Sequence, residues 1–119
     1  MIVVDDERWP RTVLASALAA VGVQAVTCAS AHEALQELAA GGVTVIVSDQ
    51  RMPVMPGDVL LGIVRDLYPG VARVLWSAYV TSDLIDNAPA CLILSKTGND
   101  GGHGSFIVDT VARLHRGAP

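Results

Sequence analysis

The chain has 119 residues, of which 51% are hydrophobic and 17% are charged, and its formal net charge is −4. This length suits one domain with its own core, and the composition is that of a globular protein rather than a disordered one. The negative charge argues against nucleic acid as a direct partner, because a phosphate backbone requires a basic surface. No apolar stretch is long enough to span a membrane, and no basic region leads into a signal peptide, so we expect a cytoplasmic protein without a membrane partner.

Short apolar runs alternate with helical patterns along the whole chain. Apolar residues that recur every three to four positions indicate amphipathic helices, whereas short runs rich in β-branched residues indicate strands. In chain order the pattern predicts strand 1–4, helix 9–21, strand 23–28, a helix from Ser30 to Gly41, strand 43–48, a helix from Pro56 to Pro69, strand 71–77, helix 81–87, strand 90–94 and helix 105–116.

This alternation predicts the fold class. Parallel strands need a crossover connection, which is usually a helix, so five strand–helix pairs favour a parallel sheet with helices on both faces. The strand 43–48 is almost entirely apolar, which is typical of a strand covered on both sides. We expect buried faces on two of the helices, formed by Leu14, Leu18 and Val21 in the first and by Leu60, Ile63, Val64 and Leu67 in the third. No internal linker interrupts the pattern.

Polar residues follow several of the predicted strands. Asp5 and Asp6 come after the first strand, Asp49 after the third, Ser77 ends the fourth, and Lys96, the only lysine of the chain, lies just beyond the fifth. In an open parallel sheet, ligands bind beyond the carboxyl ends of the strands. These five side chains therefore converge on one edge if the sheet forms as expected.

The residue types indicate a chemistry. Grouped carboxylates repel one another unless a cation neutralises them, and oxygen ligands at an accessible edge suit Mg²⁺. One carboxylate could then act as a nucleophile toward phosphorus, with Ser77 and Lys96 as donors to the phosphoryl oxygens. Each residue alone also has an ordinary role, such as a helix-end charge for the Asp5-Asp6 pair or a turn residue for Asp49. Their coincidence at consecutive strand ends favours a site.

The segments "VVDDE", "SDQRMPVMPG", "LWSAY" and "LSK" together resemble the receiver domain of bacterial two-component response regulators. They occur in the order of that family and at near-family spacing. The resemblance implies a flavodoxin-like fold of the chemotaxis-regulator type: a three-layer α/β/α architecture around a five-stranded parallel sheet in the order 2-1-3-4-5. It also implies that residues 1–119 form a single receiver domain.

The resemblance assigns the acidic residues to phosphoryl chemistry. Asp49 would be the phosphoacceptor, taking a phosphoryl group from a histidine kinase or a phosphotransfer protein. Asp6 would ligate Mg²⁺ directly and Asp5 would assist through water, while Asp49 and the backbone carbonyl of Arg51 would complete the protein ligands. The domain would catalyse only its own phosphorylation and dephosphorylation, and would not turn over small molecules.

The resemblance also assigns the switch. Ser77 stands at the switch hydroxyl and Lys96 at the lysine of the family, and both would move toward a phosphorylated Asp49. Their movement would shift the face formed by helix 81–87, strand 90–94 and helix 105–116, to which an output domain or an effector protein would respond. A homodimer through the same face is left open, as is a stand-alone regulator.

Three departures from the family pattern concern this output face. Thr97 follows Lys96 where the family usually has a proline, so we expect a trans peptide there. Ile93 replaces the usual aromatic residue, and the segment from Ser77 to Lys96 is short. Thr97, the shortened helix 81–87 and the glycine-rich loop 98–104 favour one alternative, a pseudo-receiver that acts as an interaction domain without phosphorylation. A small Mg²⁺-dependent phosphatase that uses Asp49 as its nucleophile is a second alternative.

Overall fold

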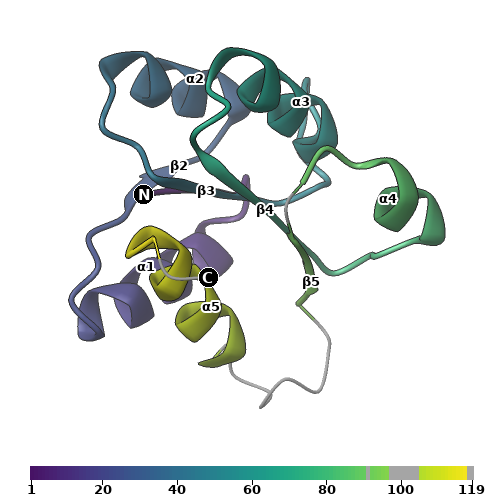
Figure 1. Cartoon of the computed structure of the whole chain (residues 1–119). Coiled ribbons are helices and arrows are strands. Elements are labelled where there is room, and N and C mark those ends of the chain that lie inside the picture. Colours follow the sequence, from purple (N-terminus) through teal and green to yellow (C-terminus); the bar gives the residue numbers. More distant parts are fainter. Residues whose placement is uncertain (91, 97–104, 118–119) are drawn as a thin grey trace.

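The computed structural model describes residues 1–90, 92–96 and 105–117, in which strands and helices alternate (Figure 1). No helix in these ranges is long and apolar enough to cross a membrane. The elements are β1 (Ile2–Val4), α1 (Arg8–Ala20), β2 (Val26–Cys28), α2 (Ala31–Ala40), β3 (Val45–Ser48), α3 (Gly57–Leu67), β4 (Ala72–Ser77), α4 (Ser82–Asn87), β5 (Leu92–Ser95) and α5 (Ser105–His115).

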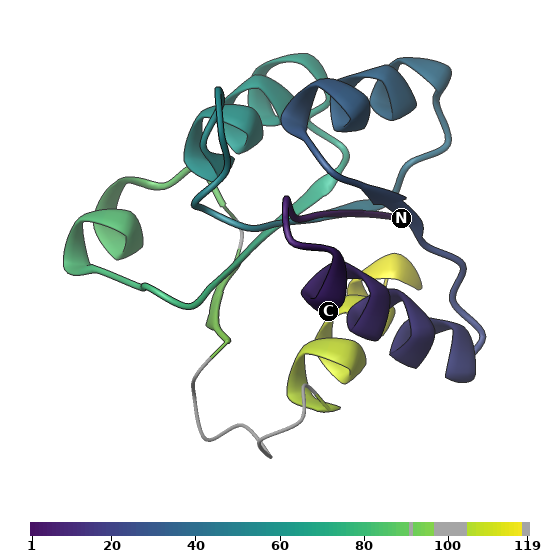
Figure 2. The same cartoon turned by 180° about the vertical axis from the view of Figure 1, so that it is seen from behind.

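The five strands form one parallel sheet in the order β2-β1-β3-β4-β5, which confirms the predicted fold. Helices α2 and α3 cover one face of the sheet, and α1 and α5 lie side by side on the other, as both views show (Figures 1 and 2). The short helix α4 lies at the β5 edge (Figure 1). The chain is therefore a three-layer α/β/α structure.

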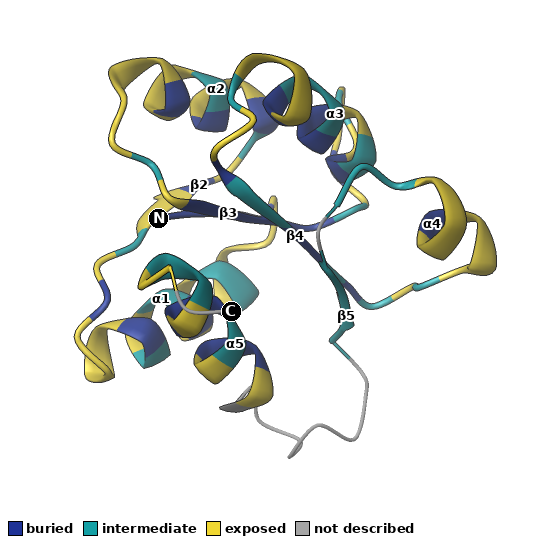
Figure 3. Cartoon of the chain, in the orientation of Figure 1, coloured by how far each residue is buried: buried dark blue, intermediate teal, exposed yellow. Residues whose placement is uncertain are grey.

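The central strand β3 is buried along its whole length (Figure 3). Its side chains alternate between two apolar layers. Ile46 packs into the layer between the sheet and α2/α3, whereas Val45 and Val47 pack into the layer between the sheet and α1/α5. Successive side chains of a strand point to opposite faces, so both layers draw on this one strand. The apolar run in the sequence is explained by this double burial.

Several predicted boundaries and faces need correction. Strand β2 begins three residues later than expected, at Val26, and the described part of β5 is Leu92–Ser95, against an expected strand 90–94. Val21 and Leu67 are exposed, although both were assigned to buried helix faces. Val21 lies just beyond the last residue of α1, and Leu67 is the last residue of α3, so neither is covered by the sheet; Leu61 is buried in α3 instead.

Two side-chain hydrogen bonds at the start of α2 form an arrangement of the capping-box type. The Ser30 side chain accepts a hydrogen bond from the Glu33 amide, and the Glu33 carboxylate accepts one from the amide of Ala29. One amide of the first helical turn and the amide of the residue before the N-cap are thereby satisfied, which stabilises the helix start.

The connection between β3 and α3 is unusually close-packed at Gly57. A Cβ atom added there would lie 2.0 Å from the backbone oxygen of Asp49. Only glycine allows the first turn of α3 to approach the end of β3 so closely. The start of α3 therefore presses directly against the backbone that carries Asp49.

We expect Gly57→Ala to destabilise the protein by about 1–3 kcal/mol, the usual range for overpacking. Alanine is the better helix former by about 1 kcal/mol, but the clash with backbone outweighs this gain. Urea unfolding measures the effect. Gly70→Ala is the matched control, because a Cβ atom at Gly70 meets nothing within 4 Å. Equal stabilities for the two variants would contradict the assigned role of Gly57.

Candidate functional site

Backbone hydrogen bonds continue the sheet beyond the strand ends and position three of the candidate residues. The amide of Asp5 donates to Cys28 on β2, the amide of Asp49 to Val4 on β1, and the amide of Lys96 to Ser77 on β4, at 2.9–3.1 Å. Asp5, Asp49 and Lys96 thus extend β1, β3 and β5 at the same edge of the sheet.

Strand alternation also sets the face toward which these side chains point. Val3 on β1 and Val47 on β3 pack into the layer under α1 and α5. Asp5 and Asp49 come two residues later on their strands and lie on the same side, because side chains alternate with a period of two. The two carboxylates therefore meet at the carboxyl edge, above the core that α1 and α5 cover.

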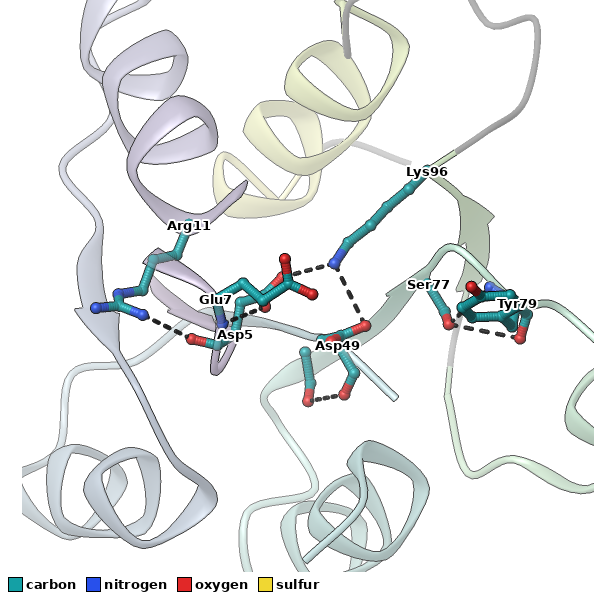
Figure 4. A network of polar contacts seen from close by, with 8 residues as sticks. Asp5, Glu7, Arg11, Asp49, Ser77, Tyr79 and Lys96 are labelled. Carbon is teal, nitrogen blue, oxygen red and sulfur yellow. Dashed lines mark hydrogen bonds and ion pairs between the residues drawn. The ribbon is translucent and has the colours of Figure 1, made fainter. Parts of the chain in front are cut away.

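Lys96 joins the two carboxylates (Figure 4). Its Nζ atom lies 2.6 Å from Oδ2 of Asp5 and 3.3 Å from Oδ1 of Asp49. Asp5 is 1% exposed and Asp49 is 8% exposed, so the ion pairs are shielded from water. The other Asp5 oxygen, Oδ1, accepts a hydrogen bond from the Glu7 amide at 2.9 Å. Asp5 is thus held from two sides.

Asp6 completes an acidic cluster. Asp5, Asp6 and Asp49 each offer a carboxylate oxygen, and these atoms lie within 4.8 Å of one another. Burial raises the pKa of the Asp49 carboxyl, Lys96 opposes that rise, and the charge of Asp5 adds to it. One ammonium group faces three carboxylates, so the cluster has an excess of negative charge. Its all-oxygen donor set, with Asp6 exposed to solvent, fits a hard cation such as Mg²⁺.

A pocket of about 210 Å³ opens above Asp49, and Glu7, Pro10, Asp49, Arg51, Ser77, Ala78, Tyr79 and Lys96 line it. At the rim of this pocket, the Arg51 guanidinium lies 4.1 Å from the centre of the Tyr79 ring. The Ser77 hydroxyl accepts a hydrogen bond from the Tyr79 amide at 3.2 Å and donates to the Tyr79 carbonyl at 3.4 Å (Figure 4). Ser77 therefore shares the pocket with Asp49 while its hydroxyl bonds to Tyr79.

The structure tests only the placement of the predicted residues. It brings Asp5, Asp6, Asp49 and Lys96 together, and it places Ser77 and Arg51 in the same pocket. Their chemical roles, including the Arg51 carbonyl as a metal ligand, stay predictions. The expected trans peptide between Lys96 and Thr97 lies outside the described residues.

The sequence reasoning missed a hydrogen-bonded clasp between Gln50 and the start of α3. The Asp58 amide donates to Oε1 of Gln50 at 2.8 Å, Nε2 of Gln50 donates to Oδ1 of Asp58 at 3.0 Å, and the Gly57 amide donates to the Gln50 carbonyl at 2.9 Å. This clasp closes the segment that begins at Asp49. In the sequence, an aspartate such as Asp58 in the first turn of a helix is a recognisable hydrogen-bonding signal. Nothing in the sequence indicates that its partner is Gln50, eight residues earlier.

Comparison with known proteins identifies the family. The model of the response regulator receiver domain matches residues 1–95. The chain therefore belongs to the receiver domains of response regulators.

Relatives and solved structures agree with this assignment. The response regulator FleR of Pseudomonas aeruginosa is 36% identical over 83 residues, which is 70% of this chain and 18% of FleR. The DNA-binding transcriptional regulator NtrC of Escherichia coli is 38% identical over 82 residues, which is 69% of this chain and 17% of NtrC. The chain thus spans less than a fifth of the length of these curated relatives.

Among solved structures, the response regulator TrrA of Thermotoga maritima, in complex with Mg²⁺ and BeF, is 25% identical. Its TM-score is 0.82, and the match covers 95% of this chain and 96% of that one. A Francisella response regulator receiver domain has a TM-score of 0.83 at 21% identity, with coverage of 97% and 94%, and supports the fold alone.

We expect Asp49→Asn to stabilise the metal-free protein near neutral pH. The folded state raises the pKa of Asp49 above its ordinary value of 3.8, so the folded protein binds the proton more tightly than the unfolded chain. Stability is then lost as the pH rises from the ordinary to the raised pKa, and it stays lost above that range. The neutral asparagine avoids this loss.

Thermal unfolding in chelator, followed from acid to neutral pH, measures this effect. The midpoint of the variant should exceed that of the wild type near neutral pH, and the gap should shrink on acidification. A variant that is less stable at neutral pH would contradict the assigned cost of ionising Asp49.

Proposed function

We propose that this receiver domain takes a phosphoryl group at Asp49, in a Mg²⁺-dependent transfer from a histidine kinase or a phosphotransfer protein. The observation that carries the proposal is the shielded contact of Lys96 with Asp49 at 3.3 Å beneath a pocket of about 210 Å³. A buried carboxylate with an ammonium group beside it, and open space above it, suits attack on an incoming phosphoryl group.

In the transfer, an ionised oxygen of Asp49 attacks phosphorus and forms the new O–P bond. The bond between phosphorus and the donor imidazole nitrogen breaks, and its electron pair stays with that nitrogen. Lys96 donates hydrogen bonds to the phosphoryl oxygens, where negative charge gathers. The Gln50 clasp and the close approach of Gly57 hold the Asp49 backbone during the attack.

Asp5, Asp6 and Asp49, with the backbone carbonyl of Arg51, would hold Mg²⁺. When bound, the ion supplies positive charge that offsets the carboxylates and the phosphoryl oxygens. Hydrolysis of the Asp49 phosphate by the domain itself completes the cycle, without turnover of other small molecules.

Ser77 would transmit the phosphorylation signal. Its hydroxyl would break its hydrogen bonds to the Tyr79 backbone and donate to a phosphoryl oxygen, and the segment after β4 would move together with Ser77. The face formed by α4, β5 and α5 would then change its affinity for an output domain or effector protein, or for a second copy of this chain. FleR and NtrC are much longer than this chain, and NtrC binds DNA. For this chain we propose a protein partner in the cytoplasm rather than nucleic acid.

Incubation with Mg²⁺ and acetyl phosphate tests the transfer. We expect intact mass spectrometry to show one phosphoryl adduct per chain that hydroxylamine removes, and no adduct on Asp49→Asn. If no adduct forms and beryllofluoride has no effect, the pseudo-receiver replaces the proposal. Steady phosphate release from unrelated phosphomonoesters would favour the phosphatase instead.

Mg²⁺ alone should stabilise the wild type. A ligand at 100 times its dissociation constant adds about 2.7 kcal/mol to the free energy of unfolding when it binds only the folded state. We expect a rise in the thermal midpoint with Mg²⁺ that is much smaller in Asp49→Asn. Asp66→Asn, which changes an exposed carboxylate on α3, is the control and should respond like the wild type. Equal responses in all three proteins would rule out a metal at Asp49.

A further inference from the structure

Lys96 reaches its partners across a neighbouring strand. It extends β5, whereas Asp49 and Asp5 extend β3 and β1, so β4 lies between the lysine and both carboxylates. Trp76 is the residue of β4 that pairs with Leu94, two positions before Lys96, and it packs against the core under α1 and α5. This is the side of the sheet on which Asp5 and Asp49 lie. The path of the Lys96 side chain therefore runs past the Trp76 ring.

The contact itself is present. The Lys96 Nζ atom lies 5.0 Å from the centroid of the Trp76 ring. A lysine ammonium within about 6 Å of an indole face is attracted by the ring quadrupole, more strongly where water is excluded. The Lys96 side chain is 16% exposed, so this attraction acts in a shielded place. Trp76 thus gives Lys96 a third partner beside the two carboxylates.

We propose that Trp76 is a positioning residue that keeps the Lys96 ammonium over Asp49 when Mg²⁺ binds the carboxylates of the acidic cluster. This inference rests on the proposed function. Mg²⁺ at the acidic cluster would compete with Lys96 for Asp5, its nearer partner at 2.6 Å, and so weaken one of its two ion pairs. A neutral indole ring is no ligand for a hard cation, so the ring contact survives metal binding.

The alternative is that Trp76 only fills space in the core. Two substitutions separate the roles: Trp76→Phe keeps an aromatic face with weaker attraction for a cation, whereas Trp76→Leu keeps an apolar side chain and removes the face. If Trp76 only fills space, the phosphorylation rate of each variant falls in step with its stability. If Trp76 positions Lys96, the rate depends on the ring itself and falls in the order tryptophan, phenylalanine, leucine.

The first measurement needs no phosphorylation. Because Lys96 is the only lysine, lysine labelled at its terminal carbon and nitrogen gives a single NMR signal. We expect the protons next to the ammonium to be shifted upfield by the ring in the wild type, with and without Mg²⁺. The shift should be smaller in Trp76→Phe and absent in Trp76→Leu. Trp9→Leu, which removes a tryptophan that is 77% exposed, is the control and should leave the signal unchanged.

The second measurement is the rate of phosphorylation by acetyl phosphate with saturating Mg²⁺. The usual strength of a lysine–tryptophan contact predicts a rate about 2- to 30-fold lower for Trp76→Leu, with Trp76→Phe between. In a Lys96→Met background, Trp76→Leu should cause no further loss, because the ring then has no ammonium to position. Thermal midpoints of all variants report any loss of folding separately.

The outcomes separate the two proposals. A lysine signal that is the same in the wild type and Trp76→Leu overturns the ring contact, whether or not the protein is phosphorylated. An altered signal with an unchanged rate, or an equal loss in the Lys96→Met background, overturns the positioning role. If the wild type takes no phosphoryl group, the proposed function fails and this role of Trp76 fails with it, while the lysine signal still decides the contact.

Discussion

The ion pairs of one lysine with two shielded carboxylates are the interaction on which the site depends. Asp5 and Asp49 end neighbouring strands and are almost fully buried. Two such charges side by side are costly unless an opposite charge compensates them. Lys96 extends β5 and supplies that charge across β4. Its ion pairs therefore link the outermost strand β5 to the inner strands β3 and β1. The remaining excess of negative charge makes the cluster suitable for a cation.

The backbone beneath Asp49 is held as firmly as its side chain. Gly57 brings the first turn of α3 against the Asp49 carbonyl, and the Gln50–Asp58 clasp closes the intervening segment. By contrast, the Ser77 hydroxyl is engaged only with Tyr79 in the described contacts. In the proposed function, Asp49 would be a firmly held phosphoacceptor, and Ser77 would be able to exchange its bond to Tyr79 for one to the phosphoryl group.

Much of this was predictable from sequence, for identifiable reasons. The strand–helix alternation and the all-apolar run at 43–48 determine a parallel sheet, and the sheet brings strand ends to one edge, so Asp5, Asp49 and Lys96 follow from topology. Contacts between side chains did not follow. The Gln50–Asp58 clasp and the bond of Ser77 to Tyr79 depend on rotamers and loop paths that no periodicity encodes. The contact of Trp76 with Lys96 depends on strand register, which the structure supplies: Trp76 lies on β4, between β3 and β5, and pairs with Leu94, two positions before Lys96.

Chemical mapping of the phosphorylated residue tests the central claim most directly. After treatment with Mg²⁺ and acetyl phosphate, borohydride reduces an aspartyl phosphate to homoserine, and peptide mass spectrometry locates it. The arrangement of Lys96, Asp5 and Asp49 predicts homoserine at position 49 alone. Homoserine at position 5 or 6, or at no position, would contradict the assignment of Asp49 as the phosphoacceptor.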